Sequence, residues 1–157
     1  MARIEKHVVR TVISLPETAT LCDAVRVMNA HGIGALGVRK DEKLVGLVTE
    51  RNVLAAIAGG ADPTREQVRE RLQPAAAAVS PAATERDCAD LMRAHHTRHL
   101  AVVDGGEMVG LISLLDLVEL VVEDKQWTVD QLEVYIRGGR AAQLSQPIAT
   151  VFSHAVL

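Results

Sequence analysis

Hydrophobic residues along the chain fall into two similar stretches, and each stretch predicts the same series of elements. Apolar residues spaced three and four apart indicate a helix, whereas short aliphatic runs between polar turns indicate strands. Helices are expected to start after Thr20 and Thr84, and again near Glu50 and Leu115. The expected strands are 11–14, 35–38, 44–48, 77–79, 100–103 and 108–112. Each stretch is therefore a strand-helix-strand-strand-helix unit.

The two units are copies of one sequence. A shift of 64 residues places 20–54 on 84–118 without a gap, and ten of the thirty-five pairs are identical. Average composition would give roughly two to three identical pairs by chance. One such unit, of about fifty residues, buries too little apolar surface to be stable alone. We therefore predict an α/β fold in which two β-α-β-β-α units pack sheet to sheet with pseudo-twofold symmetry.

The repeat also predicts how the chain is divided. Asp62 and Pro63 are suited to start a short polar helix between the units, running through Arg71. Gly138 is placed to end a long helix of the second unit that starts near Leu117. The expected parts are a first unit at 8–60, a linker at 61–76, a second unit at 77–138 and a tail at 139–157.

Composition and charge narrow the function classes. The net charge of −3 gives no general attraction to nucleic acid or to an anionic membrane, and only three aromatic residues are available to stack on bases. No apolar run approaches the roughly 18 residues of a membrane span, and the first residues lack the apolar core of a signal peptide. Cys22 and Cys88 form no CxxC pair and are expected to serve as small hydrophobic residues. The cytoplasm is the expected location.

The most specific motif lies where the last strand of each unit enters the following helix. A helix N-terminus presents N–H groups that suit a phosphate, and the hydroxyl of Thr49 or Ser113 adds a donor there. One turn later, Asp116 can accept hydrogen bonds from both hydroxyls of a ribose. The same pattern also fits a simple capping box, in which these side chains only close the helix. The segments are Gly46-Leu47-Val48-Thr49-Glu50-Arg51-Asn52-Val53 and Gly110-Leu111-Ile112-Ser113-Leu114-Leu115-Asp116-Leu117.

Both segments resemble the motif of the CBS domain: glycine, two apolar residues, Thr or Ser, two variable residues, Asp and an apolar residue. The resemblance spans about 8–138 and implies a tandem CBS module, or Bateman module, that senses an adenosine nucleotide in the cleft between its copies. AMP, ADP or ATP is the implied ligand, with NAD or S-adenosylmethionine as further options. The resemblance also implies that Arg98, His99 and the backbone around Val79 and Ser80 line the second cleft.

The two copies differ at one position of this motif. Asn52 stands where the motif has Asp, and an amide offers one oxygen and no charge to a ribose. The second cleft, with Ser113 and Asp116, is therefore the expected site. The resemblance further implies a homodimer formed through the helix at 117–136, and an effector protein outside this chain.

Other functions stay open at this point. Asn52 and the alanine-rich segment before the second unit favour a structural or interaction protein whose clefts are vestigial. Metal binding is the lesser alternative, because His95, His96 and His99 cluster but lack the ligand spacing of a zinc site. No GxSxG, phosphate-loop or HExxH motif occurs, so neither enzyme activity nor a bound cofactor is expected.

Overall fold

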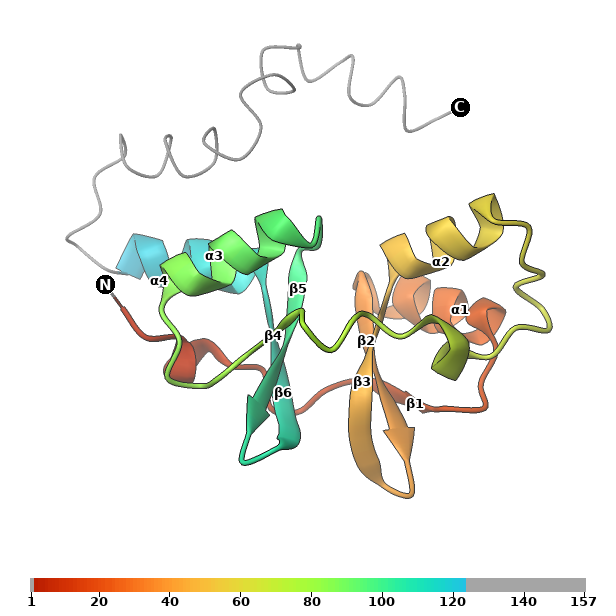
Figure 1. Ribbon diagram of the computed structural model, residues 1–157, viewed down its shortest axis with the longest axis horizontal. Helices are drawn as coiled ribbons and strands as arrows, with labels where there is room; N and C mark the ends of the chain where they lie inside the picture. The colour runs from red at the N-terminus through yellow and green to blue at the C-terminus, as the bar shows by residue number, and fades with distance from the viewer. Residues whose placement is uncertain (1, 124–157) are drawn as a thin grey trace, which may run out of the picture. The chain divides into compact units, whose positions relative to one another are not determined.

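The predicted two-unit α/β fold is confirmed (Figure 1). A computed structural model describes residues 2–123, and the chain divides into one compact unit at Met1–Leu120 and a second at Val121–Leu157. The first repeat comprises η1 (Ile4–His7), β1 (Ser14–Pro16), α1 (Leu21–His31), β2 (Ala35–Lys40), β3 (Lys43–Thr49) and α2 (Glu50–Ala58). The second comprises η2 (Val68–Arg71), β4 (Ala78–Val79), α3 (Glu85–Ala94), β5 (His99–Asp104), β6 (Glu107–Ser113) and α4 (Leu114–Glu123). The expected helix at 117–136 therefore lies largely outside the described residues.

Each repeat contributes one three-stranded sheet. The strand orders are β1-β2-β3 and β4-β5-β6, with the first pair parallel and the second antiparallel. The parallel pairs follow from the helices α1 and α3, which cross from one strand to the next. The two sheets meet where β3 contacts β6. Both sheets shift register at the same place, after Val38 in β2 and after Val102 in β5.

Each of the four α-helices within residues 2–123 begins with the same polar cap. The side chain of the N-cap residue accepts a hydrogen bond from the third helical N–H, and the third side chain accepts one from the N-cap N–H. This satisfies two N–H groups that a helix start leaves unpaired, and so fixes where each helix begins. The pairs are Thr20–Asp23, Thr49–Asn52, Thr84–Asp87 and Ser113–Asp116.

The two hairpins have the same backbone but different residues. In the second repeat, Gly105 and Gly106 have φ of 57° and 82°, which glycine adopts without steric cost. In the first repeat, Asp41 and Glu42 have φ of 48° and 67°, where a Cβ is disfavoured. The first hairpin thus keeps the shape of the second against the preference of its own residues. Gly32, with φ of 63°, ends α1 in the left-handed conformation, as predicted.

The segment that precedes each repeat packs on the other repeat. The N–H of Ile4 in η1 donates to the carbonyl oxygen of Ala83 at 3.0 Å, and the N–H of Val68 in η2 donates to that of Ala19 at 2.8 Å. These bonds are equivalent, because both ends differ by 64 residues. The side chains of Ile4 and Val68 are fully buried. η1 therefore completes the second repeat, and η2 completes the first.

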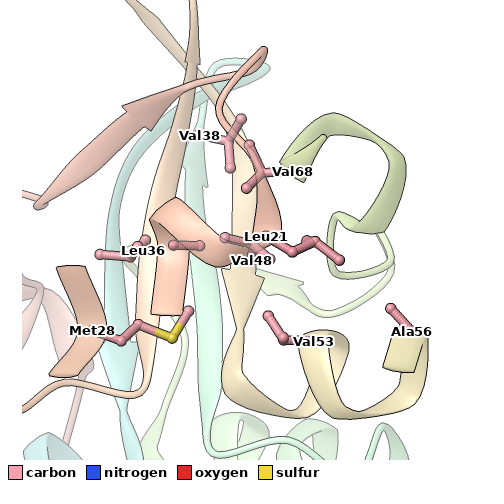
Figure 2. Close-up of a cluster of buried hydrophobic side chains, with 9 residues drawn as sticks. Leu21, Met28, Leu36, Val38, Val48, Val53, Ala56 and Val68 are labelled. Atoms are coloured by element: carbon pink, nitrogen blue, oxygen red, sulfur yellow. The ribbon is translucent and has the colours of Figure 1, made fainter. Parts of the chain in front are cut away.

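The core of the first repeat shows this exchange (Figure 2). Val68 of η2 lies beside Val38 of β2, in a cluster whose other members all belong to the first repeat. Those members are Leu21, Ala24, Met28, Leu36, Val48, Val53 and Ala56. The cluster is aliphatic, as the scarcity of aromatic residues requires.

Two elements differ from their predicted bounds. The first strand lies at Ser14–Pro16 and not at 11–14; it can include Pro16 because β1 is an edge strand that needs no N–H there. The linker helix is shorter than expected and consists only of η2. Asp62 instead stabilises a turn, where its Oδ1 accepts hydrogen bonds from the N–H and the hydroxyl of Thr64 at 3.0 and 2.6 Å.

The two cysteines are free thiols. Cys88 in α3 is fully buried, and Cys22 in α1 is half-buried. Burial, together with the charges of Asp87 and Glu85, raises the pKa of Cys88 to about 12. Cys88 thus serves as a small hydrophobic residue, as predicted.

Candidate functional site

The candidate site lies where the third strand of each repeat passes into the second helix. We call the passage from β3 into α2, residues 49–52, the first junction, and the passage from β6 into α4, residues 113–116, the second junction. Antiparallel pairing places the start of the second strand beside each junction. Ala35 lies opposite Thr49, and His99 lies opposite Ser113.

One further backbone bond is shared by the junctions. The N–H of Glu50, at the start of α2, donates to the carbonyl oxygen of Gly34 at 2.9 Å. At the second junction, the N–H of Leu114 donates to the carbonyl oxygen of Arg98 at 2.8 Å. The second junction thus brings together four of the predicted site residues: Arg98, His99, Ser113 and Asp116.

At the second junction, the hydroxyl and the carboxylate bond to each other. The N–H and the hydroxyl of Ser113 both donate to Oδ2 of Asp116, each at 2.6 Å. The N–H of Asp116 donates back to the Ser113 hydroxyl oxygen at 3.2 Å. Both bonds accepted by the carboxylate end on Oδ2, so Oδ1 remains for another donor. The cap therefore uses one carboxylate oxygen of Asp116 and leaves the other out of its hydrogen bonds.

The first junction has the same geometry with an amide. Oδ1 of Asn52 accepts the N–H and the hydroxyl of Thr49, each at 2.8 Å. That oxygen is the one acceptor of the amide side chain, and the cap occupies it. Thr49 is 2% exposed, whereas Ser113 is half-buried. A hydroxyl so buried is poorly placed to meet a ligand.

His99 is surrounded by charged groups of both repeats. Burial lowers its pKa below the ordinary value of 6.5, and the nearby Arg98 guanidinium lowers it further. The carboxylates of Glu50 and Asp116 act in the opposite direction on this pKa. These four side chains therefore share one electrostatic neighbourhood at the second junction.

Arg98 forms an ion pair across the repeats. Its Nη2 contacts Oε1 of Glu50, the first residue of α2. Both side chains are well exposed, with 65% for Arg98 and 49% for Glu50. The predicted phosphate ligand Arg98 thus already has an anionic partner, which the sequence analysis did not identify. Glu50 occupies a variable position of the motif, so no local pattern marks it.

Gln73 is a second residue that the sequence analysis missed. Its Nε2 donates to the carbonyl oxygen of His99 at 2.7 Å, and its Oε1 accepts the hydroxyl of Thr97 at 2.8 Å. Its N–H donates to the carbonyl oxygen of Leu47 in β3 at 2.7 Å. Gln73 therefore ties the lead into β5 to the first repeat. Its position in the linker gave no periodic signal.

Val79 and Ser80 lie at the opposite edge of the second sheet. Val79 is buried in β4 and pairs with Val102 of β5, which lies between β4 and β6. Ser80 follows β4, and its hydroxyl oxygen accepts the N–H of Ala82 at 3.1 Å. The hydroxyl of Ser80 thus closes a local turn.

The glycine that opens each motif permits a close crossing. A Cβ on Gly110 would lie 2.5 Å from the carbonyl oxygen of Val9, where the segment leading to β1 crosses β6. The N–H of Val9 also donates to the carbonyl oxygen of Leu111 at 2.9 Å. A Cβ on Gly46 would lie 3.3 Å from a methyl group of Leu72. The segment leading to β1 therefore requires a glycine at position 110, whereas the contact at Gly46 is with the flexible end of a side chain.

A family model for the CBS domain matches the chain twice, at residues 4–59 and 68–123. The chain belongs to the CBS-domain family. Tandem CBS modules of this kind are generally regulatory and bind nucleotides. The resemblance inferred from the two junction motifs is thus confirmed.

Individual CBS proteins resemble the chain over most of its length. A structure of a protein with CBS domains from Burkholderia ambifaria MC40-6 is 35% identical, with a TM-score of 0.64, and covers 76% of this chain and 89% of that one. A CBS domain protein from Pyrobaculum aerophilum, solved in complex with AMP, is 29% identical with a TM-score of 0.61 and covers 77% and 99%. The mitochondrial CBS domain-containing protein CBSX3 of Arabidopsis thaliana is 31% identical over 76% of this chain and 61% of its own length. The chain thus spans about three-fifths of that curated relative.

The described residues also bear on metal binding and on membrane insertion. Within residues 2–123, no group of three or more His, Cys, Asp and Glu side chains could hold a metal ion. His95 caps α3, His96 follows it with φ of 50°, and His99 lies in β5. In the same part of the chain, no helix has the length and apolar character needed to cross a membrane.

Proposed function

We propose that this CBS module is a regulatory sensor without catalytic activity, and that it binds an adenosine nucleotide at the second junction. The observation that carries the proposal is the free Oδ1 of Asp116 beside Ser113, Arg98 and His99. At the second junction, the third helical position holds a carboxylate beside Arg98 and His99, whereas Gly34, Ala35 and Asn52 hold the equivalent positions in the first. The AMP complex of the Pyrobaculum relative supports an adenylate as the ligand.

Each proposed ligand residue has a specific task. Oδ1 of Asp116 accepts the ribose hydroxyls, while Oδ2 keeps α4 capped. The Ser113 hydroxyl can turn its proton from Asp116 to a phosphate oxygen, which exchanges one acceptor for another. Arg98 pairs with the phosphate, and His99 lines the site beside it. The family resemblance assigns the base to the backbone around Val79 and Ser80, which lie across the second sheet from the junction.

The contacts around this site connect ligand binding to the packing of the two repeats. Nη1 of Arg51 in α2 donates to the carbonyl oxygen of His96 at 2.8 Å, and Gln73 bonds to His99 from the linker. A ligand that binds better to one arrangement of these contacts shifts the population toward it. The readout is proposed to occur in a separate effector protein in the cytoplasm.

A homodimer is part of the same proposal. Leu54 on α2 and Leu115 on α4 are each 66% exposed, so both helices present large apolar side chains to solvent. Sedimentation at micromolar concentration tests this part, and a monomer would contradict it.

The decisive variant is Asp116→Asn. Asn52 shows that an amide keeps the cap, so this variant should fold normally while losing the charged acceptor. The dissociation constant for AMP should rise about tenfold to a hundredfold by calorimetry, which corresponds to the loss of a charge-assisted hydrogen bond. Asp116→Ala should abolish binding as well, but it also removes the cap, so the amide variant is the cleaner test.

The matched control is Asp87→Asn, which makes the same change in the cap of α3. It should leave AMP binding unchanged. If Asp116→Asn binds AMP as well as the wild type, the site assignment is wrong. If wild-type protein binds none of AMP, ADP, ATP, NAD and S-adenosylmethionine, the sensor function itself is wrong.

A protein-interaction module with vestigial sites is the second candidate. It is favoured by the bonds between Ser113 and Asp116, which satisfy each other without a ligand. Failure of the whole nucleotide panel would select this candidate.

A further inference from the structure

The ion pair between Glu50 of the first junction and Arg98 beside the second has no counterpart related by the repeat. An offset of 64 residues places Leu114 opposite Glu50 and Gly34 opposite Arg98, so the equivalent positions carry no charge. We propose that Glu50 is a specificity-determining residue that limits how much phosphate charge the second junction accepts. This inference rests on the proposed nucleotide function and names the class of ligand more narrowly.

The absence of a side chain at Gly34 leaves room for the side chain of Glu50. It lies against Gly34, where a Cβ would come within 3.1 Å of its Cδ. Its own N–H is bonded to the carbonyl oxygen of Gly34 at 2.9 Å. With no side chain on Gly34, the Glu50 carboxylate reaches Arg98 of the other repeat.

A ligand phosphate and Glu50 must compete for Arg98. The guanidinium approaches Glu50 through Nη2, and a phosphate would need the same cationic group for a bidentate contact. The neighbouring cation Arg51 is held at the carbonyl oxygen of His96. Binding of phosphate therefore either displaces the carboxylate or places it beside a second anion.

The repulsion between the Glu50 carboxylate and the ligand grows with the number of phosphate charges. Repulsion from a fixed carboxylate adds up over each charge within a Debye length, and exposed groups are partly screened by salt. Adenosine carries no phosphate and should not sense Glu50. A nucleoside monophosphate is thus the preferred class, and a triphosphate should bind more weakly.

The test compares adenosine, AMP and ATP by calorimetry at low ionic strength, with divalent cations removed. Glu50→Gln should tighten AMP by about threefold and ATP by about tenfold, and leave adenosine unchanged, because only the charge term is removed. In an Arg98→Met background, Glu50→Gln should change AMP binding by a smaller factor, because no guanidinium is then contested.

The matched control is Glu107→Gln. Glu107 also forms an ion pair between the repeats, with Lys43 at 3.3 Å, but it lies at the opposite ends of β3 and β6 from the junctions. It should leave the ratio of ATP to AMP affinity unchanged. Thermal unfolding of each variant establishes that it is folded.

The outcomes separate the two claims. If wild-type protein binds these ligands but Glu50→Gln leaves the ratio of ATP to AMP affinity unchanged, or shifts adenosine equally, the role of Glu50 is wrong and the site survives. If neither wild-type protein nor Glu50→Gln binds adenosine, AMP or ATP, both proposals fall. A shift in the ratio that Glu107→Gln reproduces would also overturn the specific role.

Discussion

The first and second junctions have almost the same backbone and different chemistry. Both begin a helix with a hydroxyl at the N-cap and a side-chain oxygen one turn later. In the first, the single oxygen of the Asn52 amide accepts the hydrogen bonds of the cap. In the second, Asp116 caps with one oxygen and retains the other.

The difference teaches that the cap alone does not mark a ligand site. Thr20–Asp23 and Thr84–Asp87 make the same hydrogen bonds at the first helix of each repeat. The second junction is set apart by its neighbours, because Arg98 and His99 replace Gly34 and Ala35. The repeat preserves the geometry of the junctions, and a few substitutions change their chemistry.

The motif glycines offer the largest test of how alike the repeats are. Gly110→Ala would bring a Cβ against backbone, the carbonyl oxygen of Val9, and should lower the free energy of unfolding by about 2–3 kcal/mol. Gly46→Ala meets only the flexible end of Leu72 and should cost less than about 1 kcal/mol. Urea unfolding measures both values. Equal costs would show that the two crossings are equally tight.

The two hairpins predict a smaller change in the free energy of unfolding, and in the first hairpin the change is stabilising. Glu42→Gly should raise the free energy of unfolding by about 0.5–1 kcal/mol, because it relieves a side chain at φ of 67°. The reciprocal variant Gly106→Glu should lower it by a similar amount. Thermal unfolding of the pair checks the signs. A destabilising Glu42→Gly would mean that the weak pair between Glu42 and Arg39, at 3.6 Å, outweighs the backbone strain.

The smallest expected effect is a pH dependence of the free energy of unfolding, which His99 at the second junction contributes. Because the folded-state pKa of His99 is lowered, the unfolded chain binds its proton more readily. Stability from this group is therefore complete above about pH 6.5 and falls as the pH drops below that value.

His99→Gln should flatten the dependence of stability on pH between about 7 and 5. The control His31→Gln removes an exposed histidine of the first repeat and should leave the dependence as in the wild type. Urea unfolding across this pH range gives the comparison. Parallel curves for wild type and His99→Gln would contradict the burial of His99 as the cause.

Local pattern predicted most of the fold, because helix spacing, caps and turns are properties of neighbouring residues. The strands and helix starts, and the left-handed Gly32, follow from such short-range signals. The exchange of η1 and η2 could not be predicted, because an apolar Ile4 or Val68 does not reveal which core it enters. The pair between Glu50 and Arg98 joins residues 48 apart, and no sequence period connects them.

The candidate site was predictable in part. Repetition and motif spacing singled out Ser113 and Asp116, and the structure places Arg98 and His99 beside them by strand pairing. The hydrogen bond between the hydroxyl and the carboxylate depends on their side-chain rotamers, which the spacing of residues does not reveal. Gln73 was missed because its three bonds are all to distant residues.

The crossing of the two leading segments makes each half dependent on the other for its completion. If the chain were cut between residues 61 and 67, ahead of η2, each half would carry the closing segment of its neighbour and lack its own, so it would expose an apolar hole where Val68 or Ile4 belongs. The separated halves should therefore fold only when they are mixed. A lone half could satisfy itself only by trading its leading segment with an identical copy, as in a domain-swapped dimer.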